Sequence, residues 1–257
     1  MVEYDEQLAR DTERGYLMPE IVNQRVRMLA ALQLQAGEQV LDVGCGMGLL
    51  ARDLALAVGP SGCVVGIDNS KPMLKLAQRR CAELSQIELR SGSAEMIADP
   101  DNTYDVITCA QLLLYVPNVA AVLAEMYRVL KPGGRIAIVE TDWRGVLFNT
   151  ADQPFMRKLI DLWEQSIASP HLPGQLRKLL LDAEFTSVWV EGIPIINTTY
   201  LADNYSVALV DYILRSEIPR GRVTAEEGDA FSAELRQLSD DNNYFFCVNR
   251  FLFVAHK

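Results

Sequence analysis

Apolar residues recur with two alternating periods along the first half of the chain. Short runs rich in Val, Ile and Leu have the length of buried strands, and they alternate with longer segments whose apolar positions repeat every three or four residues, as in helices. The predicted strands cover 39–43, 63–67, 86–91, 104–109 and 135–140, and the predicted helices cover 18–33, 48–57, 71–84 and 118–130. This alternation predicts an α/β fold, with a parallel sheet wound on both faces by helices.

The regular alternation ends after Glu140. The later predicted elements are an amphipathic segment at 155–167, a helix at 174–183, a strand at 186–192 and a closing strand at 245–256. Residues 143–173, which begin with an irregular stretch, and residues 194–243 are interpreted as insertions that form a lid and select the substrate. We therefore predict a single domain, 1–257, with an N-terminal helical cap (1–36), a core (37–142) and two lid insertions (143–173 and 194–243).

A glycine-rich segment follows the first predicted strand. Residues 40–48 read Val-Leu-Asp-Val-Gly-Cys-Gly-Met-Gly, and a second apolar run, 64–67, ends at Asp68. A strand, a glycine-rich turn, a helix and a second strand with a terminal acidic residue are the plan of a nucleoside-binding βαβ unit. The glycines that let the backbone approach a ligand are Gly44, Gly46 and Gly48. Asp68 can bind the diol of a ribose, or it can cap the helix that starts at Ser70.

Asp42 and Leu49 indicate which nucleoside this unit binds. The dinucleotide fingerprint requires glycine where the chain has Leu49, and the Asp42 carboxylate would repel a pyrophosphate. The same carboxylate suits S-adenosylmethionine, which carries an ammonium and a sulfonium and no phosphate. An NAD-dependent oxidoreductase is therefore the less favoured alternative.

Four segments in the same order give the chain its resemblance to a known family. They are Asp42–Gly48, Asp68–Ser70 with Met73 and Leu74, Gly92–Glu95 followed by Asp101–Val106, and Leu130–Arg135. Over residues 15–142 the chain resembles the class I S-adenosylmethionine-dependent methyltransferases, especially the branch of ubiquinone and menaquinone biosynthesis and of small-molecule methylation in secondary metabolism. The resemblance implies a Rossmann-like doubly wound sheet, mainly parallel with an antiparallel last strand, plus helical lid insertions.

The resemblance also implies a binding site for S-adenosyl-L-methionine. Its expected residues are Asp42, Gly44, Gly46, Gly48, Asp68, Asn69, Met73, Ser93, Ala94 and Gln111. The family usually has Asp where this chain has Ser93, so a hydroxyl or a backbone carbonyl has to replace that contact to adenine. Met73 also fits the apolar face of its own helix, and Gln111 can instead cap a turn.

Three further residues are candidates for the methyl acceptor's side of the site. Tyr16 and Trp143 are expected to flank the cleft as a substrate wall, although aromatic residues in apolar segments more often belong to a core. His171, the histidine within the first insertion, is the candidate general base. A solvent-facing loop position is the alternative for it. A sulfonium is already an activated electrophile, so methyl transfer requires mainly alignment of the acceptor.

Composition narrows the function further. The formal charge of -10 disfavours nucleic acid as a substrate. An acidic N-terminus without an apolar stretch, and the lack of an apolar run of bilayer length, lead us to expect a cytoplasmic protein. Five cysteines without a Cys-x-x-Cys pair, and only two histidines, lead us to expect no metal. A binding protein of pericyclase type that retains fold and ligand without methyl transfer stays open as a third class.

Overall fold

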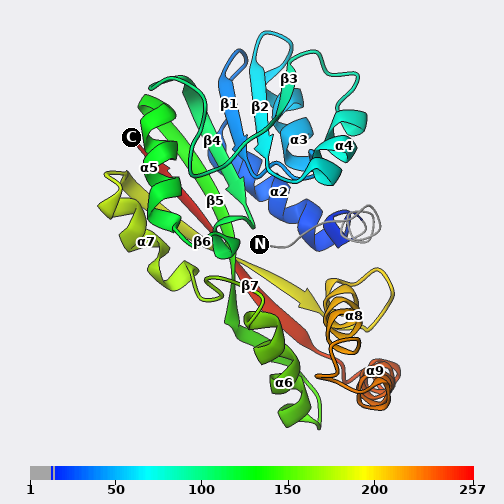
Figure 1. The fold of residues 1–257 in the computed structure, drawn as a ribbon. Coiled ribbons are helices and arrows are strands. Elements are labelled where there is room, and N and C mark those ends of the chain that lie inside the picture. The colour runs from blue at the N-terminus through cyan, green and yellow to red at the C-terminus, as the bar shows by residue number, and fades with distance from the viewer. Residues whose placement is uncertain (1–12, 14) are drawn as a thin grey trace.

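The computed structural model describes residue 13 and residues 15–257 (Figure 1). The helices are α2 (Pro19–Leu32), α3 (Leu49–Val58), α4 (Lys71–Arg80), α5 (Val119–Val129), α6 (Gln153–Glu164), α7 (Pro173–Asp182), α8 (Tyr205–Glu217) and α9 (Ala225–Asp240), with a 3-10 turn, η1 (Leu113–Tyr115). The strands are β1 (Gln39–Val43), β2 (Cys63–Asp68), β3 (Ile87–Ser91), β4 (Tyr104–Ala110), β5 (Leu130–Phe148), β6 (Thr186–Asn197) and β7 (Phe246–His256).

The seven strands form one sheet in the order β3-β2-β1-β4-β5-β7-β6. The pairs among β3, β2, β1, β4 and β5 are parallel, and β7 runs antiparallel to both β5 and β6. The predicted α/β sheet with an antiparallel last strand is thereby confirmed. The chain leaves β1 toward β2 on one side, and β4 lies on the other side of β1. This change of direction creates a crevice at the carboxyl ends of β1 and β4, where open α/β sheets bind ligands.

Helices cover both faces of the sheet and enclose two cores. On one face α5 and α7 pack on strand residues such as Leu41, Ile107 and Ile136. On the other face α2 and α3 pack on Val40 and Val106, the strand neighbours whose side chains point the opposite way. The strands read as nearly continuous apolar runs because both faces are buried, as parallel sheets require.

Strands β5, β6 and β7 extend beyond the rest of the sheet, and α6, α8 and α9 gather at that end of the molecule (Figure 1). Their side chains share a third core with the strand ends, which includes Phe148, Phe231 and Phe246. Helices of the two predicted insertions thus share one core, and we refer to residues 143–173 and 194–243 as the lid, after their predicted role. The prediction of an irregular stretch from 143 was wrong in detail, because β5 continues to Phe148 after a bulge between Asp142 and Leu147.

Other element boundaries also differ from the sequence prediction, and among them β5 begins at Leu130 instead of residue 135. Helix α4 ends at Arg80 instead of residue 84, and β6 runs to Asn197 instead of 192. Arg80, the last residue of α4, reaches the glycine loop, where its Nη1 donates to the Met47 carbonyl. Within the described part of the chain, no helix combines the length and the apolar character that a bilayer span requires.

Candidate functional site

The cleft at the carboxyl edge of the sheet is formed by the ends of β1, β2 and β4 together with α2. It has an empty volume of about 1020 Å³, which includes space open to solvent. Of the residues predicted to bind donor or substrate, Asp42, Gly44, Gly46, Asp68, Asn69, Met73, Gln111 and Tyr16 line it. The structure therefore brings together residues that are up to 95 positions apart in the sequence.

The three glycines of the loop have different physical roles. All have positive φ, at 74° for Gly44, 51° for Gly46 and 77° for Gly48. A Cβ at Gly46 would meet nothing within 4 Å, so its backbone faces the open cleft. A Cβ at Gly48 would lie 2.9 Å from the Cβ of Ala77, because α3 and α4 pack closely there. Gly48 lies outside the cleft lining and allows two helices to approach each other.

Asp68 at the end of β2 is bound to the glycine loop. Its Oδ2 accepts a hydrogen bond from the Gly46 N–H at 2.9 Å, and its Oδ1 accepts one from the Ser70 N–H at 2.7 Å. Ser70 itself caps α4 by accepting from the Met73 N–H at 3.4 Å, so the capping role considered for Asp68 belongs to Ser70. Burial raises the pKa of Asp68, and the backbone hydrogen bonds oppose that shift. A carboxylate has further acceptor sites for ligand hydroxyls.

Asp42 is the most deeply buried carboxylate in the cleft wall. Only 1% of the residue is exposed, and its Oδ1 accepts a hydrogen bond from the Thr108 hydroxyl at 2.8 Å. Its Oδ2 is buried without a hydrogen-bond partner. Burial raises the pKa of Asp42 to about 7. An orphaned carboxylate oxygen in a cleft wall is what a cationic ligand would satisfy, because a buried charge is stable only when paired.

Gln111 follows β4 and is held in a strained conformation. Its φ is 55°, which is uncommon for a residue other than glycine. Its Nε2 donates to the Val139 carbonyl at 3.1 Å, and its Oε1 accepts from the Thr141 hydroxyl at 2.7 Å. These bonds fix the side chain against β5, so the surrounding structure compensates the strain. Gln111 is thus part of a rigid wall rather than a simple turn cap.

The loop after β4 is fixed by a buried carboxyl group in the middle of β5. The Oε1 atom of Glu140 accepts hydrogen bonds from the N–H groups of Leu112 at 3.1 Å and Leu113 at 2.7 Å. Its Oε2 is buried without a partner, and burial raises the pKa of Glu140 to about 8. Glu140 therefore positions the loop that carries Leu112, Tyr115 and Val116 into the cleft wall.

The N-terminal wall of the cleft comes from α2 and the residues before it. Arg25 donates through Nη1 to the Tyr16 carbonyl at 2.9 Å and through Nε to Asp53 at 2.9 Å, so it attaches Tyr16 to α3. Burial raises the pKa of Tyr16. Gln24, with 2% exposure, lies on the same buried face of α2 as Ile21 and Met28. The prediction placed Tyr16 in the wall but missed Gln24, although a glutamine on an apolar helix face was a visible signal.

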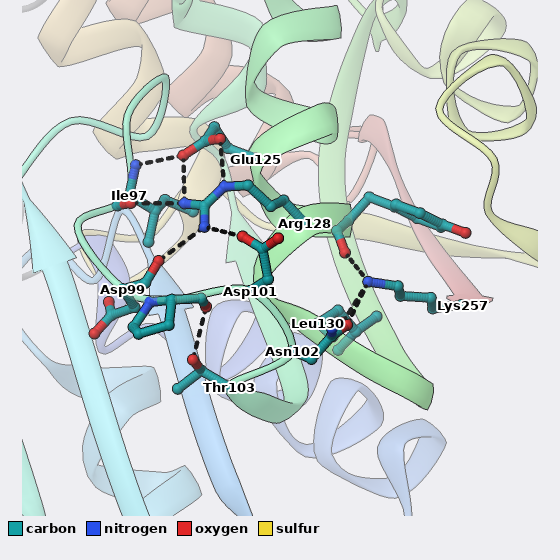
Figure 2. A network of polar contacts seen from close by, with 11 residues as sticks. Ile97, Asp99, Asp101, Asn102, Thr103, Glu125, Arg128, Leu130 and Lys257 are labelled. Atoms are coloured by element: carbon teal, nitrogen blue, oxygen red, sulfur yellow. Dashed lines mark hydrogen bonds and ion pairs between the residues drawn. The ribbon is translucent and has the colours of Figure 1, made fainter.

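Ser93 and Ala94 lie in the turn after β3 and are not among the residues that line the cleft. The Ser93 hydroxyl accepts a hydrogen bond from the Glu95 N–H at 3.2 Å. Arg128 of α5 anchors the chain that follows this turn (Figure 2). It donates through Nη2 to the Ile97 carbonyl at 2.8 Å, through Nη1 to the Asp99 carbonyl at 2.9 Å and to Asp101 at 2.8 Å, and through Nε to Glu125 at 2.8 Å.

Trp143 and His171 also lie outside the residues that form the cleft lining. Trp143 is 2% exposed and packs edge-on against Trp163 at 5.3 Å in the core of the lid. His171 lies between two carboxylates, 3.6 Å from Asp142 and 3.6 Å from Glu164, where the lid joins the sheet. The structure therefore brings Tyr16 to the cleft but neither Trp143 nor His171.

Several cleft residues were not predicted from the sequence. They are Ile21, Gln24, Arg25, Cys45, Met47, Leu49, Leu50, Ser70, Ala110, Leu112, Tyr115 and Val116. Most are apolar and follow a strand or face the sheet, so their pattern does not distinguish them from core residues. Within the residues that the structure describes, no group of three His, Cys, Asp or Glu side chains is arranged to hold a metal ion.

The fold and this cleft define an α/β protein that binds a nucleoside-containing ligand at the switch point of its sheet. The sequence profile of a methyltransferase domain matches residues 40–134. A demethylmenaquinone methyltransferase of Oceanobacillus iheyensis is 43% identical over 175 residues, which are 61% of this chain and 73% of the relative. The chain belongs to the class I S-adenosylmethionine-dependent methyltransferases, in the branch that contains the demethylmenaquinone methyltransferases.

Two other comparisons bear on length and fold. A 37.1 kDa protein encoded in a transposon of Streptomyces fradiae is 36% identical over 186 residues, 72% of this chain and 52% of the relative. The chain thus spans about half the length of that relative. The solved structure of phosphoethanolamine N-methyltransferase 2 of Haemonchus contortus with S-adenosylhomocysteine has a TM-score of 0.66 at 18% identity, over 99% of this chain and 58% of that one. This last likeness shows the fold.

Proposed function

We propose that this protein transfers a methyl group from S-adenosylmethionine to a small organic acceptor. The observation that carries the proposal is the pair of carboxylates at neighbouring strand ends, with Asp42 presenting an orphaned buried oxygen and Asp68 bound to the glycine loop. When bound, S-adenosylmethionine supplies a methyl group on a sulfonium, which needs no further activation. The family of the chain supports the same donor.

The roles of the donor-site residues follow from their chemistry. Asp42 would pair with the ammonium, which needs a carboxylate in a buried wall. Asp68 would accept hydrogen bonds from the ribose hydroxyls, and Gly46 lets the backbone come close because it has no side chain. Asn69 and Met73 line the cleft beyond Asp68 and would contact the adenine. Ser93, Ala94 and Gly48 do not line the cleft, so they would affect donor binding indirectly, through the conformation of the neighbouring backbone.

The acceptor would occupy the part of the cleft beside α2 and the loop after β4. Tyr16, Ile21, Leu112, Tyr115 and Val116 give this part an apolar and aromatic wall, which suits an organic metabolite better than a nucleic acid or a protein. The net charge of -10 also opposes a polyanionic partner. Acceptance at oxygen, nitrogen or carbon is compatible with this wall. The resemblance described above supports a role in natural-product biosynthesis.

Enclosure by the lid would supply the alignment that methyl transfer requires. Residues 143–173 and 194–243 hold α6, α8 and α9, which share one core at the carboxyl ends of β5 and β6 and the amino end of β7. A cover of this kind excludes water and limits the orientations of the acceptor. His171 would help to attach the lid to the sheet, because it lies between Asp142 and Glu164. It is not among the residues that line the cleft, and direct proton transfer would require hydrogen-bond distance to the acceptor.

The proposal is tested by binding and by turnover. Purified protein is titrated calorimetrically with S-adenosylmethionine, S-adenosylhomocysteine and NAD, and the protein as isolated is denatured and examined by mass spectrometry for S-adenosyl compounds. We expect binding of the adenosyl compounds and none of NAD. Tighter binding of NAD would refute the donor assignment. Donor binding without S-adenosylhomocysteine formation across a broad acceptor library would favour a binding protein that does not methylate.

A further inference from the structure

Arg250 on β7 is a buried cation that has no ion-pair partner among the residues the structure describes. The residue is 4% exposed. Its Nη1 donates to the Gln24 side-chain oxygen and its Nη2 donates to the Tyr205 hydroxyl at 3.3 Å. Its guanidinium carbon lies 5.2 Å from the centre of the Tyr205 ring. Its Nε is buried without a hydrogen-bond partner, and no described carboxylate forms an ion pair with it.

This environment is energetically unfavourable unless something else supplies negative charge. Two neutral oxygens and an aromatic face replace part of the hydration that a guanidinium loses on burial, but they do not neutralise its charge. Glu140 is close enough for the Arg250 charge to lower its pKa, yet burial outweighs that effect and raises the pKa to about 8. Glu140 forms no ion pair with Arg250 in the described structure: its Oε1 accepts from the Leu112 and Leu113 N–H groups, and its Oε2 is buried without a partner.

Arg250 is connected to the cleft through residues on one face of the sheet. It pairs directly with Thr141 across β5 and β7, and directly opposed residues of an antiparallel pair project to the same face. Thr141 donates to Gln111, and Arg250 donates to Gln24. Gln111 and Gln24 both line the cleft. Arg250 is therefore separated from the cleft by a single side chain, that of Gln24.

The order of the strands places Arg250 on the acceptor's side. The donor residues Asp42, Asp68 and Gln111 come from or follow β1, β2 and β4, whereas Arg250 lies on β7, two strands beyond β4. Its partner Tyr205 is the first residue of α8, which belongs to the lid. Arg250 therefore lies where sheet, α2 and lid meet, away from the glycine loop.

We propose that Arg250 binds a carboxylate of the methyl acceptor and selects for acidic acceptors. This inference rests on the proposed methyltransferase function. A carboxylate accepts two parallel hydrogen bonds from a guanidinium edge, and Arg250 has an unused Nε–H on such an edge. The Nε–H shares its edge with Nη2, so a carboxylate that takes the place of the Tyr205 hydroxyl would accept from both Nε and Nη2 and supply the missing charge. The adjacent wall would hold the apolar body of the acceptor.

The test compares aromatic carboxylates with their primary amides, which have nearly the same shape and no charge. Benzoate and 1-naphthoate are each paired with benzamide and 1-naphthamide, and dissociation constants are measured by NMR titration with saturating S-adenosylhomocysteine. The wild-type protein is expected to bind the acids at least about 10-fold tighter, the factor that a charge-assisted hydrogen bond provides. In Arg250→Met the preference should fall to within about 2-fold.

Two further variants test whether the preference for acids depends on the planar guanidinium group and on its position at residue 250. Arg250→Lys keeps the charge without the planar fork and should retain a preference of intermediate size; it also serves if Arg250→Met does not fold. Arg135→Met is the matched control, because Arg135 is also a sheet arginine but is paired with Glu38 and lies outside the cleft lining. It should keep the full preference for acids.

The outcomes for donor and acceptor are distinguishable. Failure of the wild-type protein to bind S-adenosylhomocysteine would contradict the proposed function itself. Normal S-adenosylhomocysteine binding with no preference for acids over amides would overturn the role of Arg250 and leave the function standing. The affinity of Arg250→Met for S-adenosylhomocysteine should stay within about 2-fold of wild type. A loss of 10-fold or more would show that Arg250 serves the donor's carboxylate, and would overturn the proposal.

Discussion

The Gly46 N–H donates to Asp68 Oδ2 at 2.9 Å, so the glycine loop after β1 is attached to the acidic end of β2. The two features by which the sequence indicates a nucleoside site are thus one structural unit. Because the bond comes from the loop's most open glycine, the backbone of the loop is positioned before a ligand arrives. Preorganisation of this kind reduces the ordering cost of binding.

Asp68→Ala should weaken adenosine binding by at least about 10-fold, because a charged acceptor for two hydroxyls is worth about 1.5–3 kcal/mol. The same change removes the bond to Gly46, so affinity alone does not separate ribose contact from loop support. Comparison of adenosine with 2′,3′-dideoxyadenosine by calorimetry does. The wild-type protein should prefer adenosine by at least about 10-fold, and the variant should bind both equally. A preference that survives in the variant would assign Asp68 to loop support alone.

Donor affinity should depend on pH through Asp42, whose pKa burial raises to about 7. Only the ionised carboxylate can pair with the ammonium. Affinity for S-adenosylhomocysteine should therefore be constant above about pH 7 and fall as the pH decreases below it, approaching about tenfold per pH unit. Calorimetry at pH 5.5, 6.5 and 7.5 measures this. Asp42→Asn should bind weakly with a flat profile over this range, and a variant profile as steep as wild type would exclude Asp42 as the titrating group.

Gly48→Ala should destabilise the fold, whereas Gly46→Ala should affect mainly the ligand. A Cβ at Gly48 would lie 2.9 Å from the Cβ of Ala77, and both glycines have positive φ. We expect a loss of at least about 2 kcal/mol in the free energy of unfolding for Gly48→Ala, and about 1 kcal/mol for Gly46→Ala. Urea unfolding checks both. Addition of Ala77→Gly should recover part of the loss at Gly48, and no recovery would mean that the strained φ alone is responsible.

The sequence predicted the α/β core well because periodicity, glycine turns and strand-end acids all indicate the same arrangement there. It identified Gly48 as a glycine of the loop but could not predict its role, because the side chain that requires a glycine there is Ala77 of another helix, α4. The turn of Ser93 matched a family segment, yet its neighbourhood depends on Arg128 of α5. Contacts between distant segments carry no local pattern, so the sequence cannot show which side of such a contact faces a ligand.

The lid was the least predictable part for a related reason. The strand β5 continues past a bulge after Asp142, and a bulge interrupts the period on which strand prediction depends. Trp143, which directly follows, then belongs to the lid core rather than to the cleft. The hydrogen bond between Gln24 and Arg250 could not be predicted either, because the two residues are 226 positions apart in the sequence.

Exchange of the part of the acceptor specificity that the lid contributes should require replacement of both lid segments at once. Residues 143–173 and 194–243 contribute to one core, in which Phe155 of α6 packs edge-on against Phe231 of α9 at 5.2 Å. A swap of one segment for that of a related methyltransferase should therefore destabilise the protein, since the two halves of a core must match in shape. A swap of both should fold, change the acceptor profile, and leave the affinity for S-adenosylhomocysteine within about 3-fold.

Hydrogen exchange gives an independent measurement of the same lid. If the lid closes over bound donor and acceptor, backbone amides of α6 and α8 should exchange more slowly in the complex, because local opening becomes less frequent. Amides of α5, which is already packed against the sheet and contributes no residue to the cleft lining, should change little and serve as the internal control. Unchanged exchange in α6 and α8, together with an unchanged acceptor profile after the double swap, would show that the lid is peripheral and that the wall around Tyr16 selects the acceptor.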